Sequence, residues 1–158
     1  AIGGFEGELY LYFHEVDYAL RIIDAGWEIV YFPQSIVVHN IVSANRRYDH
    51  HLVDNRKVYY DVRNLFIVIY LHFPFLKSVP LFLRILFGRI TYGILNNKLF
   101  IVLSAIKSAI SIMIKSKSNR TIVSESTQAR YSFGSFAGGF FFYNCNYGLR
   151  RPRWMNQN

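Results

Sequence analysis

The 158-residue sequence predicts an α/β fold, and three observations support this. An amphipathic pattern from about residue 14 to 25 is typical of a helix. Two segments after it, WEIVYF and SIVVH, are separated by Pro33 and are rich in the β-branched and aromatic residues that strands favour. Patterns with helical spacing follow from about residue 52 onward. With 52% hydrophobic residues, the chain has room for one domain with a sizeable core.

The first expected helix follows a turn at Gly3–Gly4 and a short extended segment from Leu9 to Phe13. Its apolar residues recur at i, i+3, i+4 and i+7 and therefore share one face: Val16, Ala19, Leu20 and Ile23. Gly26 stands where a C′ glycine ends a helix, so we expect the helix to end just before it.

The rest of the chain up to residue 116 predicts three further helices. Residues 40–50 are polar and turn-prone, which is typical of a loop. A second helix is expected from about Leu52 to Leu71, ending before Pro74. Two more helical patterns follow Pro80 and are broken near Asn96–Asn97.

The last helical pattern is amphipathic. One line along it is polar: Ser104, Lys107, Ser108, Ser111 and Lys115. The opposite face is apolar: Val102, Leu103, Ile106, Ile110, Met113 and Ile114. A membrane-spanning helix needs about 20 largely apolar residues, and basic residues interrupt this region: Lys77, Arg84, Arg89, Lys98 and Lys107. Two interpretations stay open: the helices pack on one another, or they lie in the headgroup region of a membrane.

Charge is distributed unevenly along the chain. Residues 1–62 hold nine acidic and five basic side chains, whereas residues 63–158 hold thirteen basic ones and a single acid, Glu125. A basic, apolar half suits an anionic membrane surface. Nucleic-acid binding would rest on the charge and aromatic residues of the tail alone, so we do not expect a nucleic-acid partner.

Composition divides the chain into three regions. Residues 1–75 form the α/β part, residues 76–116 a membrane-associated amphipathic helical region, and residues 117–158 a polar linker followed by an irregular tail rich in glycine, aromatic and basic residues. The single cysteine, Cys145, excludes an intramolecular disulfide. The chain opens on Ala1 without a methionine, so we expect further sequence upstream.

Two acidic residues begin the first expected helix. Glu15 and Asp17 lie in its first turn, where the helix dipole favours ionised carboxylates. An ionised carboxylate beside a loop can accept a proton from a hydroxyl group. Acidic residues also serve capping and solubility at this position, so the pattern alone leaves both roles open.

The string GGFEGELYLYFHEVDYALRIIDAGWEIVYFPQSIVVH, residues 3–39, resembles the C-terminal part of the GT-A catalytic domain in family 2 glycosyltransferases, particularly the rhamnosyltransferase-like members. The family pattern lies over these residues without a gap and matches Gly3, Gly4, Phe5, Tyr12, Asp17, Arg21, Ala25, Gly26, Ile29, Tyr31, Pro33, Val37 and His39. Ser43 and Arg63–Asn64 extend the likeness more loosely to about Pro74, so it covers about half of the chain.

The resemblance implies transfer of a sugar from a nucleotide donor with inversion at the anomeric carbon. It places the catalytic base on Glu15, although the chain has His14–Glu15 where the family has a Glu-Asp pair. His14, Asp17 and Arg21 fall at positions that support the acceptor side of the pocket. His39 matches a histidine that binds the metal or the diphosphate in some relatives.

The resemblance also implies partners and a cofactor. The partners are a nucleotide-sugar donor and a saccharide or lipid-linked acceptor at the inner face of the membrane. The cofactor is a divalent cation, Mg or Mn, which neutralises the diphosphate leaving group. The sequence contains no Asp-x-Asp pair and no nucleotide-binding βαβ unit. His39 alone does not suit a cation that prefers oxygen ligands, so we expect this chain by itself to bind no cation.

We therefore expect a fragment of an inverting glycosyltransferase of polysaccharide biosynthesis in the cell envelope. The resemblance favours a cytoplasmic location, peripheral at the inner face of the membrane. Without the nucleotide-binding half, we expect the chain alone to be inactive. The alternative is a non-catalytic membrane-surface interaction protein derived from a transferase.

Several other polar residues have structural interpretations. His50–His51 lack the spacing of a zinc site. His72 lies in an apolar run and is expected to be structural or interfacial. Arg21 can pair with Asp17 at i+4. Arg63 and Asn64 interrupt an apolar helix, and we expect a buried polar pair that supports the site.

Overall fold

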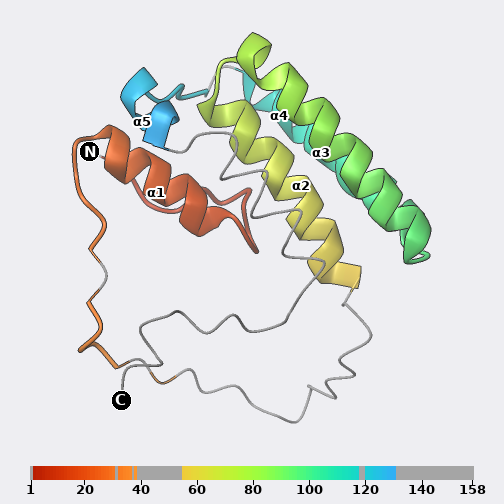
Figure 1. The fold of residues 1–158 in the computed structure, drawn as a ribbon, viewed down its shortest axis with the longest axis horizontal. Coiled ribbons are helices and arrows are strands. Elements are labelled where there is room, and N and C mark those ends of the chain that lie inside the picture. The colour runs from red at the N-terminus through yellow and green to blue at the C-terminus, as the bar shows by residue number, and fades with distance from the viewer. Residues whose placement is uncertain (1, 31, 37, 39–54, 118–119, 131–158) are drawn as a thin grey trace.

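The computed structural model describes residues 2–30, 32–36, 38, 55–117 and 120–130 (Figure 1). The helices in this part of the chain are α1 (His14–Asp24), α2 (Asn55–His72), α3 (Phe75–Leu95), α4 (Leu99–Lys115) and α5 (Glu125–Arg130). The expected helices at 14–25 and 52–71 are confirmed as α1 and α2 within the described residues. Residues 40–50 of the expected loop, and His51 after it, lie outside that part.

The predicted α/β class, the back end of a GT-A fold, is wrong for the described residues, which contain helices and no strand. A strand requires a neighbouring backbone to complete its ladder of hydrogen bonds. The Trp27 amide donates instead to the Ile22 carbonyl of α1, and the Ser35 amide donates to the Phe32 carbonyl in a turn. The strand-like composition therefore produces an irregular segment with exposed apolar residues: Trp27, Ile29, Val30, Phe32, Ile36 and Val38.

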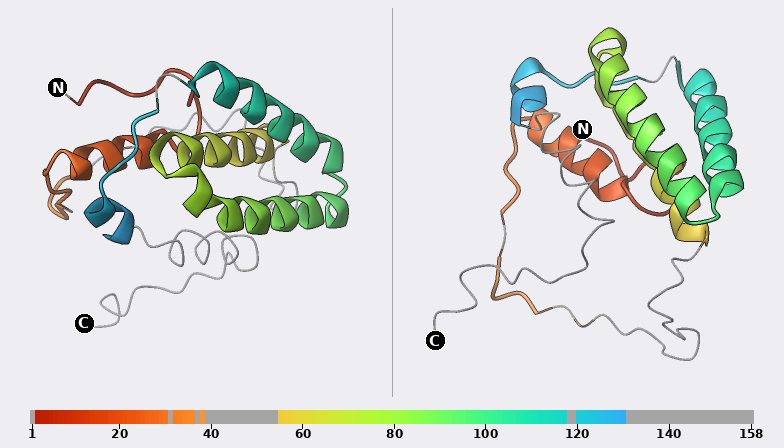
Figure 2. Two further views of the ribbon diagram at one scale, coloured as in Figure 1. Left: turned by 90° about the horizontal axis from the view of Figure 1, so that it is seen from above. Right: turned by 45° about the vertical axis from the view of Figure 1, so that its right-hand side comes forward.

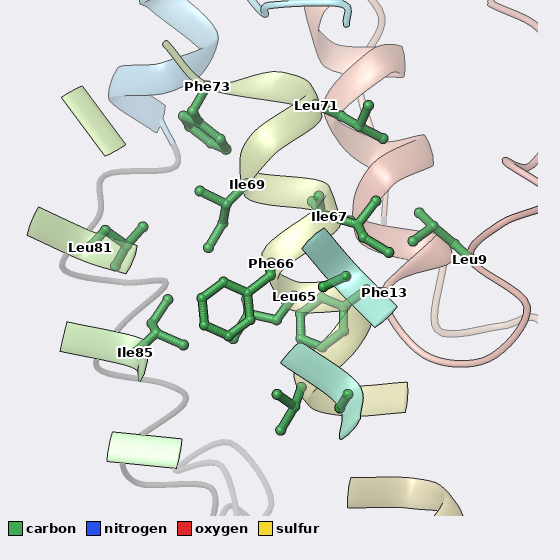
Figure 3. Packing of buried hydrophobic residues seen from close by; sticks show 14 of the residues in the cluster. Leu9, Phe13, Leu65, Phe66, Ile67, Ile69, Leu71, Phe73, Leu81 and Ile85 are labelled. Carbon is green, nitrogen blue, oxygen red and sulfur yellow. The ribbon is translucent and has the colours of Figure 1, made fainter. Parts of the chain in front are cut away.

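The core is built around α2, which lies between α1 on one side and the α3–α4 hairpin on the other (Figures 1 and 2). The second half of α2 is buried on nearly every face, and its buried apolar residues include Leu65, Phe66, Ile67, Val68 and Ile69. Figure 3 shows Leu81 and Ile85 of α3 on one side of this helix, and Leu9 and Phe13 from the segment before α1 on the other. A helix that is apolar all round needs such cover on all sides.

Both α1 and α3 end in a Schellman motif. After α1, Gly26 has φ +84°, its amide donates to the Ile23 carbonyl, and the Trp27 amide donates to the Ile22 carbonyl. After α3, Asn97 has φ +55° and the Lys98 amide donates to the Gly93 carbonyl. The breaks expected at Gly26 and at Asn96–Asn97 are confirmed, because both residue types tolerate the left-handed backbone.

Two expectations about the later helices are wrong. The third helix begins at Phe75 and contains Pro80, whereas the pattern predicted a start after that proline. The first turn of α3 is fixed by Ser78, whose amide and hydroxyl both donate to the Pro74 carbonyl. On α4 the buried residues are Val102, Ala105 and Ala109, and much of the expected apolar face is exposed: Leu103, Ile110 and Ile114.

One described helix, α3, is long and apolar enough to cross a membrane by length and composition alone. Only about a quarter of its apolar window is buried within the protein, at 28%. The basic residues within α3 are too few to exclude it as a membrane-spanning helix by length and composition.

The α3–α4 hairpin depends on the absence of a side chain at Gly93. A Cβ atom there would lie 3.1 Å from the Leu99 Cα and 3.2 Å from a Val102 methyl. We expect Gly93→Leu to lower the free energy of unfolding by about 2 kcal/mol because the two helices must separate. Thermal unfolding followed by circular dichroism measures this. Thr91→Leu, at an exposed position of the same helix, is the control, and equal melting temperatures for the two variants would contradict the prediction.

Candidate functional site

The candidate site centres on the buried carboxylate of Asp17, which is 2% exposed. Asp17 Oδ1 lies 2.6 Å from His72 Nε2, and Oδ2 accepts hydrogen bonds from Arg21 Nη2 at 2.7 Å and Nε at 3.2 Å. The i+4 pair of Asp17 and Arg21 is confirmed, but it is an interior contact and no surface pair. His72 is 1% exposed, so its expected structural role is confirmed as well.

Both ring nitrogens of His72 face acceptors. Nδ1 lies 3.0 Å from the Thr121 carbonyl, which can only accept, so Nδ1 carries a proton. Nε2 faces the Asp17 carboxylate, which accepts when it is ionised. The hydrogen-bonding pattern therefore makes His72 a cation paired with the Asp17 anion.

The pKa of Asp17 lies below its ordinary value of 3.8. Burial opposes ionisation and by itself would raise this pKa. Hydrogen bonds from His72 and Arg21, together with the positive charge of both partners, outweigh the effect of burial. Asp17 is consequently an ionised anchor that accepts hydrogen bonds, because a carboxylate already held by two cationic partners is a weak proton acceptor.

Arg21 connects α1 to the beginning of the chain. Besides Asp17, its guanidinium donates to the carbonyls of Ile2 at 2.6 Å and Gly4 at 2.7 Å. Gly3, between them, has φ +75°, and a Cβ atom there would lie 3.6 Å from Arg21 Nη1. Four of the residues matched by the resemblance, Gly3, Gly4, Asp17 and Arg21, thus lie together around this network.

Arg63 and Asn64 hold the segment that leads into α1. The fully buried Asn64 amide donates to the carbonyls of Leu11 and Tyr12, and Arg63 Nε donates to the Asn64 side-chain oxygen at 2.8 Å. Asn64 is buried as expected, whereas Arg63 is only partly buried, and the support that the pair gives to a catalytic site stays a prediction. The extended segment expected at 9–13 is wrong, because Tyr12 and Phe13 have φ +62° and +65° and turn the chain into the helix.

Glu15 lies on the solvent side of α1. It follows from helix geometry that residues two apart point in nearly opposite directions, and Asp17 points inward. The Glu15 side chain is 70% exposed, and its Oε1 lies 3.1 Å from His14 Nε2. The rings of His14 and Phe5 pack edge to face at a centroid distance of 5.3 Å, and Phe5 is 62% exposed. The start of α1 therefore presents a carboxylate, an imidazole and an aromatic ring together.

In the described part of the chain, no group of side chains could ligate the divalent cation that the resemblance implies. No three His, Cys, Asp or Glu residues there come close enough to hold a metal ion. His39 lies outside the described residues, so its place relative to Glu15 is not part of the geometry above.

Sequence reasoning missed the pairing of Asp17 with His72. The two residues are 55 positions apart, and the only local signal is a histidine in the otherwise apolar run around Leu71 and Phe73. A polar residue in such a run indicates a buried partner without naming it.

Sequence reasoning also missed the tertiary contacts of residues 120–124, which were expected to belong to a polar linker. Arg120 donates to the carbonyls of Tyr70 and Phe73, and the Ser124 amide donates to Asp24 Oδ1 at 2.7 Å. Residues 120–124 therefore connect the C-terminal ends of α1 and α2.

Comparison with protein-family models, characterised proteins and solved structures finds no match to this chain. The site is therefore interpreted from its own geometry.

The Asp17 network makes stability depend on acid pH. Because the pKa of Asp17 is lowered, its contribution is complete above about pH 3.8 and is lost as the pH falls through the folded-state pKa. We expect Asp17→Asn to lower the free energy of unfolding by about 3 kcal/mol at neutral pH, since it leaves a buried cation unpaired.

The difference between wild type and Asp17→Asn should shrink as the pH falls below about 4. Chemical unfolding between pH 7 and pH 3 measures it, with the exposed Glu15→Gln as the matched control, expected to change stability by less than about 0.5 kcal/mol. A gap that stays constant over this range would contradict the assignment.

Proposed function

We propose that this chain supplies the acceptor side and the catalytic base of an inverting glycosyltransferase, and that Glu15 is the base. The observation that supports this proposal most directly is the exposed carboxylate at the start of α1, beside His14 and Phe5. A base that deprotonates a bound hydroxyl must be reachable by the acceptor, and Glu15 is.

The surroundings of Glu15 fit a saccharide acceptor. One face of a sugar ring is made of C–H groups and stacks on an aromatic ring, and exposed Phe5 offers such a ring next to His14. His14 contacts the Glu15 carboxylate and is only 29% exposed, so it limits the orientations that the carboxylate adopts. The Phe5 ring and the Glu15 carboxylate therefore provide a stacking surface and a proton acceptor close together.

Asp17 and Arg21 act as positioning residues in this proposal. They fix the start of α1 against residues 2–4 and against His72, so that the first turn cannot shift when an acceptor approaches. Rigid support of this kind matters because catalytic geometry tolerates errors of only about 0.5 Å.

The proposed step has a simple balance. Glu15 takes the proton of the acceptor hydroxyl, the hydroxyl oxygen forms a bond to the anomeric carbon, and the bond from that carbon to the diphosphate oxygen breaks. The nucleoside diphosphate leaves with the bonding electrons, and the configuration at the anomeric carbon is inverted. No described residues fit the implied divalent cation, so no step is assigned to a metal.

Acceptor binding tests the proposal on the chain as it is. Saturation-transfer NMR with neutral oligosaccharides should show binding. Glu15→Ala should weaken it about tenfold, the loss expected for one hydrogen bond to a charged group. Glu28→Ala removes another exposed glutamate and serves as the control. No saccharide signal, or equal affinities for both variants, would count against Glu15.

Sugar transfer tests the expectation that the chain alone is inactive. The chain incubated with UDP-, GDP- and dTDP-sugars and an acceptor should show no transfer above the Glu15→Ala background, because no nucleotide-binding unit is recognisable in its sequence. Measured transfer by the isolated chain above that background would show that it is complete as an enzyme.

A further inference from the structure

The outer side of α3 carries a continuous apolar stripe, called here the α3 stripe: Leu76, Leu83, Phe87 and Ile94. These residues are spaced by seven, four and seven positions, which places them on one line along the helix. Their exposed fractions are 83%, 61%, 75% and 58%. The stripe runs nearly the whole length of α3, about 27 Å at the helical rise per residue.

The α3 stripe faces away from the rest of the described protein. The buried positions of α3 include Ser78, Ile85 and Gly93, and they lie on the opposite side of the helix, toward α2 and α4. In the left view of Figure 2, α3 lies at the edge of the bundle. An apolar face of this length is unusual for a surface exposed only to water.

Charge points to the class of partner. The sequence contains no acidic residue between Asp61 and Glu125. Exposed cations lie on both helices of the hairpin: Arg84 on α3, and Lys107 and Lys115 on α4. Apolar side chains beside lysine and arginine match an anionic lipid surface, where each basic residue adds to the attraction.

The packing of α3 favours a helix that lies on a bilayer over one that crosses it. Arg89 on its inner side is paired with Asp61 of α2 at 2.9 Å. Crossing would carry this pair and the polar first half of α2 into hydrocarbon, at a large energetic cost. Lying flat leaves the inner contacts intact and buries only the stripe.

We propose that the α3 stripe binds the surface of an anionic lipid bilayer, with α3 parallel to the membrane plane. This inference does not rest on glycosyl transfer, since no residue near Glu15 takes part in it. It assigns the membrane contact to one helix face, where the sequence indicated only a basic, apolar region.

Vesicle co-sedimentation of the 158-residue chain tests the proposal. Phosphatidylcholine vesicles that contain phosphatidylglycerol should bind the chain more tightly than vesicles of phosphatidylcholine alone, and salt should reduce the difference. The double variant Leu83→Glu/Phe87→Glu should weaken binding at least about tenfold, because it removes buried apolar area and adds negative charge.

The matched control is Ile36→Glu/Val38→Glu, which changes the same number of exposed apolar residues outside α3. Its affinity for anionic vesicles should stay within about twofold of wild type, because charges far from the contact are screened. Far-UV circular dichroism confirms that each variant keeps its helices. Should the α3 variant unfold, Arg84→Gln replaces it, with an expected loss of about fivefold on anionic vesicles.

Three results would overturn the proposal. The first is that wild type sediments with neither vesicle, and the second is that the α3 variants bind as tightly as wild type. The third is a wild-type dimer that Leu83→Glu/Phe87→Glu dissociates while vesicle binding stays unchanged, which would make a second copy of the chain the occupant of the stripe. None of these results bears on saccharide binding at Glu15.

Discussion

The contact between Asp17 and His72 joins three segments that are distant in sequence. Asp17 belongs to α1, His72 ends α2, and the other ring nitrogen of His72 binds the Thr121 carbonyl. Because the carboxylate is buried, it requires cationic partners, and His72 and Arg21 are these partners. This requirement fixes the position of α1 against α2 together with the buried Leu20 and the hydrogen bonds from Asn64 to the segment before α1.

The first turn of α1 divides its two acids between different tasks. Asp17 is ionised, buried and fully engaged, while Glu15, two residues earlier, points to solvent. Helix geometry alone produces this division once one of the two is anchored. It also explains how a family-like motif can combine structural residues with a reactive one: Gly3, Asp17, Arg21 and Gly26 shape the backbone, and the proposed base is the residue left accessible.

Local patterns in the sequence were enough to predict α1 and α2 and the ends of α1 and α3, since Gly26 and Asn97 carry their own backbone preference. They misplaced the start of α3, which contains Pro80. The strands that composition predicted are absent from the described residues, because a strand-like segment needs a neighbouring strand that composition does not reveal. The interior face of α4 was misjudged for a related reason. Small residues, Ala105 and Ala109, allow the closest approach to α2, so they are buried ahead of larger Ile110 and Ile114. For the site, i+4 spacing predicted Arg21 with Asp17, whereas His72 required the tertiary fold.

The order of the helices has a consequence for the size of an acceptor. α1 and α3 lie on opposite sides of α2 (Figure 1), and Glu15 points outward from α1 while the α3 stripe points outward from α3. Packed helices lie about 8–10 Å apart, so the carboxylate stands roughly 20 Å or more above a bilayer that touches α3. A sugar attached directly to a lipid headgroup does not reach that height. Were Glu15 to act as proposed while α3 lies on a bilayer, its acceptor would be the end of a chain several sugar units long, and not a sugar attached directly to the lipid.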